Sequence, residues 1–250
     1  MSKQERSRRP VALITGAARR IGAAIARRLH DAGYDLALHY RHSRDELDAL
    51  IAQLEQARAA STLALQAELG DVSGLAALIS AAVNQFGRLD ALVNNASAFY
   101  PTPVGTTTPA QWEELFGANV RAPYFLAQAA APRLAEHGGA IVNIVDIYAE
   151  WPLPQHSVYS MSKAALAMMT KTLARELGPA VRVNGVAPGA VLWPDSGKSS
   201  ADREAMIERT PLKRTGSPED VAGAVLWLLR DAPFVTGEIV RIDGGRHLAI

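Results

Sequence analysis

The chain has 250 residues, of which 48% are hydrophobic and 20% are charged, and its formal net charge is +1. Such a composition can bury a sizeable core, so wholesale disorder is excluded, and the length suits one large α/β domain or two small ones. The balanced charge gives no electrostatic case for a nucleic-acid or membrane-surface partner. The sequence contains no cysteine. Disulfides, thiolate metal sites and a cysteine nucleophile are therefore excluded, and the scattered histidines predict no other metal site.

The N-terminal residues are charged and polar, and the apolar run that follows covers only Val11 to Ile14. A signal peptide needs a longer apolar stretch, and a membrane span needs about 20 residues. We therefore expect a cytoplasmic protein. Residues 1–9 are expected to form a mobile tail, and residues 10–250 a single domain, because no linker or shift in composition divides them.

Short apolar runs alternate with longer helical patterns along the chain. The pattern predicts a strand at 11–15, a helix at 21–31, a strand at 35–40, a helix at 45–59, a strand at 61–66, a helix at 73–86 and a strand at 89–95. It continues with a helix at 109–136 that Pro123 and Pro132 bend or interrupt, a strand at 140–145, a helix at 158–177, a strand at 181–186, a helix at 218–229 and a strand at 238–243. These repeats predict an α/β fold: a doubly wound, mainly parallel seven-stranded sheet with helices on both faces.

The turn between the first strand and the first helix reads TGAARRIG at 15–22. Its small residues would let the backbone approach a pyrophosphate, and the following helix offers unpaired N–H groups at its start. The segment indicates a nucleotide-binding loop, with an ordinary strand-to-helix turn as the alternative.

The end of the second strand indicates which nucleotide would bind. A free ribose 2′-hydroxyl is usually held by an acid about 20 residues beyond such a loop. No acid lies between Leu36 and Arg44, and the strand ends instead in Arg41, His42 and Ser43. These side chains would donate hydrogen bonds to a 2′-phosphate, which favours NADP over NAD. A solvated basic turn is the alternative.

Tyr159 and Lys163 are four residues apart and share one face of the helix predicted at 158–177. A phenol has a pKa near 10, and a nearby ammonium stabilises the phenolate and lowers that pKa. We expect Tyr159 to exchange a proton with a bound substrate. A surface pair with no catalytic role is the alternative for this spacing taken alone.

Three further segments are LVNNAS at 92–97, YSMSK at 159–163 and NGVAPG at 184–189. Together with TGAARRIG they resemble the short-chain dehydrogenase/reductase family over residues 11 to about 247. The resemblance implies a Rossmann-type fold, Asn119 in a proton relay, and a homotetramer built through 109–136, 156–178 and the last strand. It implies cofactor contacts from Gly16, Arg19, Arg20, Ile21, Gly22, Tyr40, Arg41, His42, Ser43, Glu68, Leu69, Asn94, Ala96, Ser97, Tyr159, Lys163, Pro188 and Gly189.

Departures from the common family pattern resemble the pteridine reductase branch, close to bacterial dihydromonapterin reductases. Arg20 stands where a third glycine is usual, Ser97 ends the NNAS motif, and Glu68 replaces an aspartate. Asp146, thirteen residues before Tyr159, replaces a serine that hydrogen-bonds a substrate carbonyl in most members. The run NNASAFYPTP at 94–103 is the most specific resemblance.

This branch implies an NADPH-dependent reductase of the C=N bonds of dihydropterins, and of oxidised pterins and folates as further substrates. Asp146 and Tyr159 would deliver the proton. The expected substrate contacts are Arg20, Ser97, Phe99, Asp146, Tyr148, Tyr159, Leu192 and Trp193, with Tyr100 as a further pocket wall and 190–200 as a lid. The alternatives are a dihydromonapterin reductase, a 3-oxoacyl or general carbonyl reductase, and a non-catalytic NADP-binding regulator. Arg246 and His247 are expected near a neighbouring copy's pocket.

Overall fold

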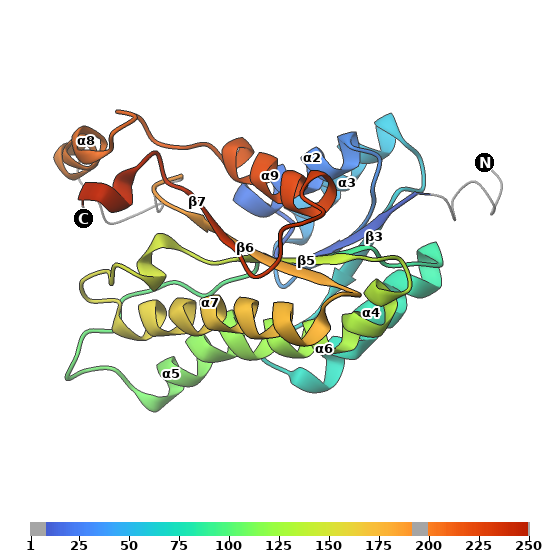
Figure 1. The fold of residues 1–250 in the computed structure, drawn as a ribbon, viewed down its shortest axis with the longest axis horizontal. Helices are drawn as coiled ribbons and strands as arrows, with labels where there is room; N and C mark the ends of the chain where they lie inside the picture. The colour runs from blue at the N-terminus through green and yellow to red at the C-terminus, as the bar shows by residue number, and fades with distance from the viewer. Residues whose placement is uncertain (1–8, 192–199, 250) are drawn as a thin grey trace.

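A computed structural model of the chain describes residues 9–191 and 200–249 (Figure 1). Its strands form one seven-stranded sheet in the order β3-β2-β1-β4-β5-β6-β7, and every neighbouring pair is parallel. The strands are Val11–Ile14 (β1), Asp35–Tyr40 (β2), Thr62–Gln66 (β3), Ala91–Asn94 (β4), Ala140–Ile144 (β5), Arg182–Pro188 (β6) and Ile239–Ile242 (β7). The predicted Rossmann-type fold is confirmed.

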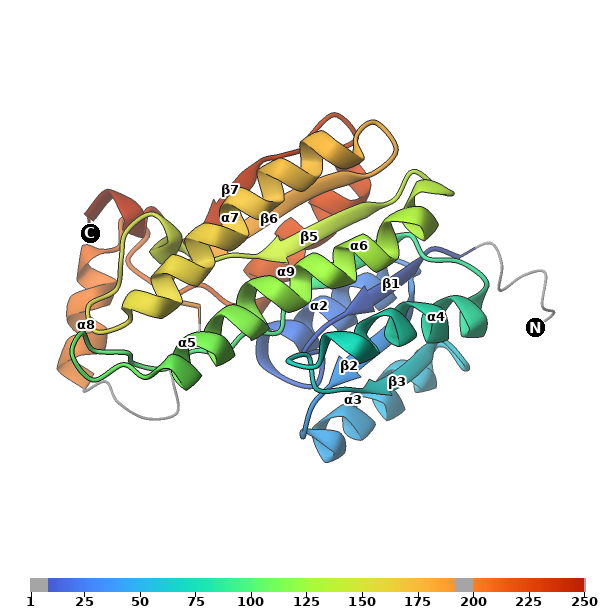
Figure 2. The same cartoon turned by 90° about the horizontal axis from the view of Figure 1, so that it is seen from below.

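Helices cover both faces of this sheet (Figures 1 and 2). They are Arg20–Asp31 (α2), Arg44–Ala57 (α3), Leu75–Phe86 (α4), Pro109–Phe116 (α5), Ala122–Ala135 (α6), Ser157–Leu177 (α7), Ser200–Arg209 (α8) and Pro218–Leu226 (α9). Helices α2, α3 and α9 lie on one face, and α4, α6 and α7 lie on the other. Helix α8 lies beside the C-terminal turn Arg246–Ala249 (η5). None of the helices within the described ranges is long and apolar enough to cross a membrane.

Two large hydrophobic clusters lie one on each side of the sheet, and a smaller third cluster contains Leu115, Val158 and Tyr159. In β1, Ala12 and Ile14 pack into the cluster beneath α2 and α9, while Val11 and Leu13 pack into the cluster beneath α4, α6 and α7. Successive side chains of a strand point to opposite faces, and here both faces are covered. This explains why the strands read as uninterrupted apolar runs.

The region between α5 and α6 shows where the helical stretch predicted at 109–136 is interrupted. A π-helical turn, Gly117–Arg121 (η2), separates the two, and the amide of Ala122 donates to the carbonyl of Gly117. Pro123, the second residue of α6, has no N–H to donate to the carbonyl of Asn119 four residues earlier, so a wider turn is favoured there. Pro132 lies inside α6 without interrupting it. The interruption therefore precedes Pro123.

Several predicted features fall wholly or partly outside the described residues. The predicted N-terminal tail lies there except for Arg9, whose guanidinium pairs with Asp35 at 3.2 Å. The predicted substrate contacts Leu192 and Trp193, and most of the predicted lid, also lie outside the described ranges.

Candidate active site

Two glycines beside the turn between β1 and α2 occupy positions where a side chain would be strained or would clash. Gly16 has a φ of +63°, and a Cβ on Gly22 would lie 2.1 Å from the Gly16 carbonyl oxygen. Asn95 Nδ2 donates to the carbonyls of Thr15 and Gly16, at 2.9 and 3.0 Å. Thr15 Oγ1 in turn accepts from the amides of Asn95 and Ala96, at 2.9 and 3.0 Å. The segment that leaves β4 therefore holds the glycine loop in place.

The residues around this turn fit a dinucleotide. Helix α2 has no acidic residue in its first turn and no side-chain cap, so its N-terminus can receive a pyrophosphate. Asn94 is buried and donates through Nδ2 to Asn143 Oδ1 at 2.8 Å. Its Oδ1 has no hydrogen-bond partner among the described residues, which leaves an acceptor for a ribose hydroxyl.

Two arginines stand at the start of α2, and both are exposed. Arg20 has a φ of 54°, a left-handed conformation that costs a side-chain-bearing residue about 1–2 kcal/mol. Such strain often marks functional positions. Ile21, the next residue, packs against the core beneath α2. Of the predicted cofactor contacts at the start of this helix, Arg19 and Arg20 therefore carry their charge at the surface.

The predicted 2′-phosphate site lies at the end of β2. Arg41 pairs through Nε with Glu68 Oε2, and both side chains are about half exposed. An exposed ion pair of this kind contributes little to the stability of the fold. Arg41 can therefore release the carboxylate and bind a phosphate at a small cost in free energy. His42 is exposed, and Ser43 precedes α3 without a side-chain cap contact, so both can face a ligand.

Two other predicted cofactor residues are buried. Tyr40 is buried at the end of β2, and its hydroxyl accepts from Arg44 Nη1 at 3.0 Å. Leu69 packs in the core cluster that includes Leu75 and Leu78 of α4, so contact with a cofactor from this residue would come through its main chain.

The predicted catalytic side chains meet beyond the end of β5. Tyr159 Oη donates to Asp146 Oδ2 at 2.7 Å. Asp146 Oδ1 accepts from the amide of Tyr148 at 2.9 Å, which caps the short turn Ile147–Ala149 (η3). Lys163 Nζ donates to the carbonyl of Ile144 at 2.8 Å. One loop and one helix thus bring Asp146, Tyr159 and Lys163 together.

Asn119 is fully engaged in hydrogen bonds. Its Oδ1 accepts from Ser97 Oγ and from the amide of Ala98, each at 2.9 Å. Its Nδ2 donates to the carbonyl of Ala98 at 3.1 Å and to Ser162 Oγ at 2.9 Å. These bonds join η2 to the segment after β4 and to α7. No contact recorded among the described residues joins Asn119 to Lys163, so the predicted relay through both residues stays a prediction.

The three predicted catalytic groups lie close enough to affect one another's pKa values. Burial raises the pKa of Asp146. The hydrogen bonds from the Tyr148 amide and the Tyr159 hydroxyl, and the charge of Lys163, act in the opposite direction but do not cancel this rise. Burial, and next the charge of Asp146, raise the pKa of Tyr159 well above 10.0. Burial lowers the pKa of Lys163 to about 8. The expectation that Lys163 lowers the pKa of Tyr159 is therefore wrong for this arrangement, because Asp146 is the charge that contacts the phenol. Tyr159 retains its proton and can act as a donor.

Aromatic rings pack beside Tyr159. The ring centroid of Phe99 lies 4.7 Å from that of Tyr159, with the two planes at 83°. It lies 4.8 Å from the ring of His156 in a nearly parallel stack. Phe99 is 46% exposed, so its ring is available to a planar ligand. Tyr100 instead directs its hydroxyl to Glu114 Oε2 at 3.0 Å, toward α5.

The C-terminal segment packs against the loop that follows β5 and contains Asp146 and Tyr148. The side chains of Arg246 and Tyr148 share a hydrogen bond, and Arg246 Nη1 donates to the carbonyl of Met206 at 3.4 Å. The ring centroid of His247 lies 5.3 Å from that of Trp151. Arg246 and His247 thus contact their own chain, and their predicted approach to a neighbouring copy stays a prediction.

The end of β6 completes this edge of the sheet. Pro188 is the last residue of β6 and is buried. The amide of Gly189 donates to the carbonyl of Ile242 at 3.0 Å, and a Cβ on Gly189 would lie 2.6 Å from Asp243 Cβ. The close approach of the two chain segments explains a glycine at this position.

Sequence reasoning missed three residues that shape the site: Thr15, Asn95 and His39. Each holds main-chain groups of the glycine loop or of its neighbours. A histidine within an apolar strand was the available signal for His39. Thr15 and Asn95 lie inside motifs that the sequence singled out, but their partners are backbone groups, which residue types do not reveal.

Comparisons with known proteins agree with this geometry. The family described as enoyl-(acyl carrier protein) reductase matches residues 16–247. The chain is 38% identical over 280 aligned residues to pteridine reductase 1 of Leishmania tarentolae, with 96% of each chain covered.

Other relatives bear names of acyl reductases. A Streptomyces violaceoruber protein named as a ketoacyl reductase of granaticin polyketide synthase is 38% identical over 246 residues, with 96% of each chain covered. The 3-oxoacyl-[acyl-carrier-protein] reductase of Staphylococcus epidermidis is 33% identical over 241 residues, covering 95% of this chain and 98% of its own. Because relatives of different names are similarly close, overall identity does not decide the substrate.

Proposed function

The chain belongs to the short-chain dehydrogenase/reductase family, and within it we propose that the protein is a pteridine reductase that uses NADPH to reduce dihydropterins. Family membership itself supports an oxidoreductase that uses NAD(P). The observation that carries the finer proposal is the 2.7 Å hydrogen bond between Tyr159 Oη and Asp146 Oδ2.

A carboxyl group at this position suits C=N reduction better than carbonyl reduction. A carbonyl needs a neutral donor beside the catalytic tyrosine, whereas reduction of C=N adds hydride to carbon and a proton to nitrogen. Bound NADPH supplies the hydride. Tyr159, whose raised pKa keeps its proton, donates to the ring nitrogen. Asp146, whose pKa is also raised, can hold a proton nearer neutral pH and return it to Tyr159.

The surroundings of the pair suit a flat heteroaromatic ring. Phe99 presents a half-exposed ring beside Tyr159 on which a pterin can stack. Arg20, Ser97 and Tyr148 would offer donors and acceptors at the ring edge. An acyl chain has no planar face and would gain less from Phe99, which favours a pterin over a 3-oxoacyl substrate.

Preference for NADPH over NADH is proposed from the end of β2. Arg41 lies just beyond this strand, and no acid occurs between Leu36 and Arg44. The carboxylate that Arg41 contacts, Glu68, belongs to the segment after β3 and forms a half-exposed pair. A 2′-phosphate with about two negative charges would compete well with that single carboxylate.

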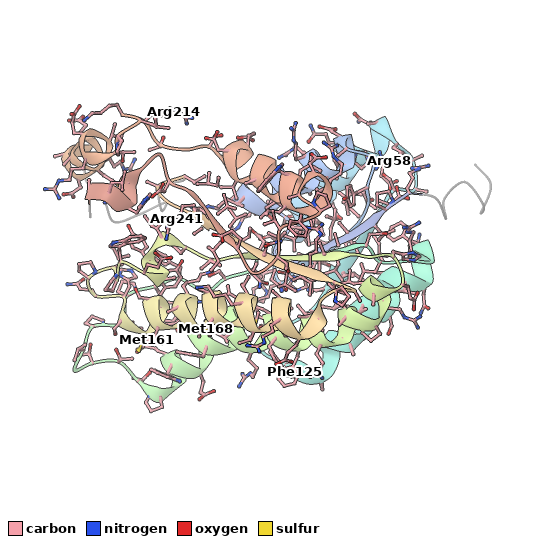
Figure 3. The ribbon with its side chains drawn as sticks, viewed as in Figure 1. Arg58, Phe125, Met161, Met168, Arg214 and Arg241 are labelled. Atoms are coloured by element: carbon pink, nitrogen blue, oxygen red, sulfur yellow. The ribbon has the colours of Figure 1, made fainter. Side chains whose placement is uncertain are left out.

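We also propose that the protein is a homotetramer. The layer of α5, α6 and α7 exposes Trp112, Tyr124, Met161 and Met168, the last at 59%. Figure 3 shows Met161 and Met168 with Phe125 along this layer. A hollow of about 410 Å³, lined by Phe116, Val120, Phe125 and Met169 among others, opens on the same face. Such an apolar surface is typical of an interface.

The substrate proposal is tested by steady-state kcat/KM with dihydrobiopterin, dihydromonapterin, biopterin, folate and a β-ketoester, each with NADPH and with NADH. We expect the highest value for a dihydropterin with NADPH. A higher value for dihydromonapterin than for dihydrobiopterin would select that narrower activity. A preference for the β-ketoester would contradict the proposal, and equal efficiency with NADH would contradict the cofactor preference.

A further inference from the structure

His39 is a histidine buried near the C-terminal end of an apolar strand, β2, with 2% of its surface exposed. Both of its ring nitrogens have partners. Nδ1 accepts from the amide of Gly16 at 3.1 Å, and Nε2 lies 3.2 Å from the carbonyl oxygen of Ala67. An amide can only donate and a carbonyl can only accept, so the ring must be neutral with its proton on Nε2.

The main chain of the same residue continues this connection. The carbonyl of His39 accepts from the amide of Ala17 at 2.8 Å. His39 therefore holds two successive amides of the glycine loop, those of Gly16 and Ala17, one through its ring and one through its backbone. Its Nε2 reaches the segment after β3, which continues to Glu68. One buried ring joins the pyrophosphate end of the predicted cofactor site to its adenosine end.

We propose that His39 is a positioning residue of the dinucleotide site, whose neutral Nε2-protonated ring fixes Gly16 in the conformation that binds the cofactor. The proposal rests on the NAD(P) site of the family and not on the pterin substrate. Its success or failure is therefore separate from that of the proposed function.

The charge of the ring gives this role a pH dependence. A protonated ring would carry an N–H on Nδ1, which would face the Gly16 N–H donor to donor and break that bond. Charged residues lie in the loop at Arg19 and Arg20, after β2 at Arg41 and after β3 at Glu68, and of these four Glu68 is the one whose charge acts on the ring. Burial lowers the pKa of His39, while the Ala67 carbonyl and the charge of Glu68 act in the opposite direction. The neutral ring therefore prevails at neutral pH. Because the pKa of His39 lies below 6.5, the ordinary pKa of histidine, cofactor affinity should fall as the pH decreases below that value.

Two substitutions separate the two ring contacts. In His39→Asn the Oδ1 atom can take the place of Nδ1 and accept from Gly16, but the side chain is too short to reach Ala67. In His39→Gln the Nε2 atom can donate to Ala67, but the acceptor for Gly16 is lost. His39→Leu removes both contacts. We expect NADP⁺ to bind His39→Asn within about twofold of the unmodified protein, and His39→Gln and His39→Leu about tenfold more weakly.

His30 offers a matched control for loss of a buried histidine. It lies in the last turn of α2, far along the helix from the glycine loop, and is also 2% exposed. Its Nε2 lies 2.8 Å from Ser61 Oγ, and burial lowers its pKa as well. His30→Asn should lower the thermal unfolding temperature and leave the dissociation constant for NADP⁺ unchanged.

The experiment is calorimetric titration of NADP⁺ and NAD⁺ into each variant between about pH 5 and 8. The NAD⁺ titration removes the ionisation of the 2′-phosphate from the comparison. The unmodified protein should lose affinity for both ligands on the acid side more steeply than His39→Asn. Nitrogen NMR of histidine-labelled protein should report a neutral ring protonated on Nε2 without any ligand. Equal affinity losses in His39→Asn and His39→Gln, the same pH profile in both proteins, or the opposite tautomer would overturn the proposal.

Discussion

Arg20 holds a left-handed backbone conformation, with a φ of 54°, at the start of α2. Glycine adopts this conformation without a steric penalty. Arg20→Gly should therefore raise the free energy of unfolding by up to about 1 kcal/mol, after allowance for the greater freedom of glycine in the unfolded chain. The same change removes a guanidinium from the cofactor loop, so NADPH affinity should fall. Chemical denaturation and NADPH titration measure the two effects.

Ala60 provides the control, because it has the same φ of 54° in the turn before β3. Ala60→Gly should change stability in the same direction without altering NADPH affinity. Unchanged NADPH affinity in Arg20→Gly would show that the strained arginine has no role in binding the cofactor.

Lys163 is buried, and its pKa is lowered from 10.5 to about 8. The folded state thus favours the neutral amine. The stability that this group contributes is fully present above 10.5 and is lost as the pH falls through about 8. Lys163→Met removes this dependence. At neutral pH the variant should be more stable than the unmodified protein. This difference in the free energy of unfolding should decrease by about 3 kcal/mol as the pH rises above 10.5, the pKa of lysine in the unfolded chain.

Denaturant unfolding of both proteins across that pH range measures the difference in free energy directly. Turnover should be lost in Lys163→Met at every pH. A stability difference that does not change with pH would mean that the Lys163 amine is not desolvated as its contact with Ile144 implies.

At the scale of elements, the π-helical turn η2 places Asn119 between the segment after β4 and α7. Pro123→Ala would supply the missing N–H and favour a regular helix through this region. Asn119 would then leave its position, and kcat should fall by at least about tenfold, because small displacements in a site are costly. The fold should stay as stable as before or become more stable.

Pro132→Ala is the matched change, because Pro132 lies within α6 without a wide turn. It should raise stability and leave kcat unchanged. Hydrogen exchange over 117–121 reports whether the turn has become regular. An unchanged kcat in Pro123→Ala, together with a regularised turn, would separate Asn119 from catalysis.

Much of the fold could be predicted because the inner strands β1, β2, β4, β5 and β6 are buried on both faces. Such strands read as apolar runs, and the alternation of strand and helix specifies a parallel sheet. The turn at η2 could not be placed, since a proline signals an interrupted helix without giving the position of the break. The position of the break depends on main-chain groups, because the amide of Ala122 bonds to the carbonyl of Gly117 and Pro123 has no N–H to donate.

The candidate site was predictable where a motif carries its own chemistry. The spacing of Tyr159 and Lys163, together with the family resemblance that singled out Asp146, identified residues that the structure brings together. The direction in which the pKa of Tyr159 shifts was not predictable from that spacing. It depends on burial and on the charge of Asp146, which lies in the loop after β5. The role of His39 depends on two backbone groups from other segments, so its chemistry appears only in the folded chain.

At the scale of the whole molecule, the exposed layer of α5, α6 and α7 is the surface on which copies should associate. Tyr124 is 41% exposed and Met168 is 59% exposed on this layer. Glutamate at both positions would place charges in a desolvated contact. The double variant Tyr124→Glu, Met168→Glu should therefore be a smaller species than the tetramer expected for the unmodified protein.

Light scattering at micromolar concentration measures the mass of each species. The conservative pair Tyr124→Phe, Met168→Leu should keep the full mass, because the face stays apolar. A monomeric unmodified protein, or an unaltered mass in the glutamate variant, would contradict assembly through this layer.

The strands of the sheet are parallel and end at one edge of it (Figures 1 and 2). The glycine loop follows β1, Arg41 follows β2, and Asp146, the partner of Tyr159, follows β5, so these groups belong to that edge. We propose that Asp146 makes the site at this edge suited to reduce pterins instead of carbonyl compounds. This proposal is tested most directly by kcat for dihydrobiopterin in Asp146→Ser, with NADPH affinity and thermal stability measured alongside. We predict that kcat falls by about 10²–10⁴ while NADPH affinity and the fold are retained. An unchanged kcat would show that Asp146 only caps the turn that follows it, and would contradict the account.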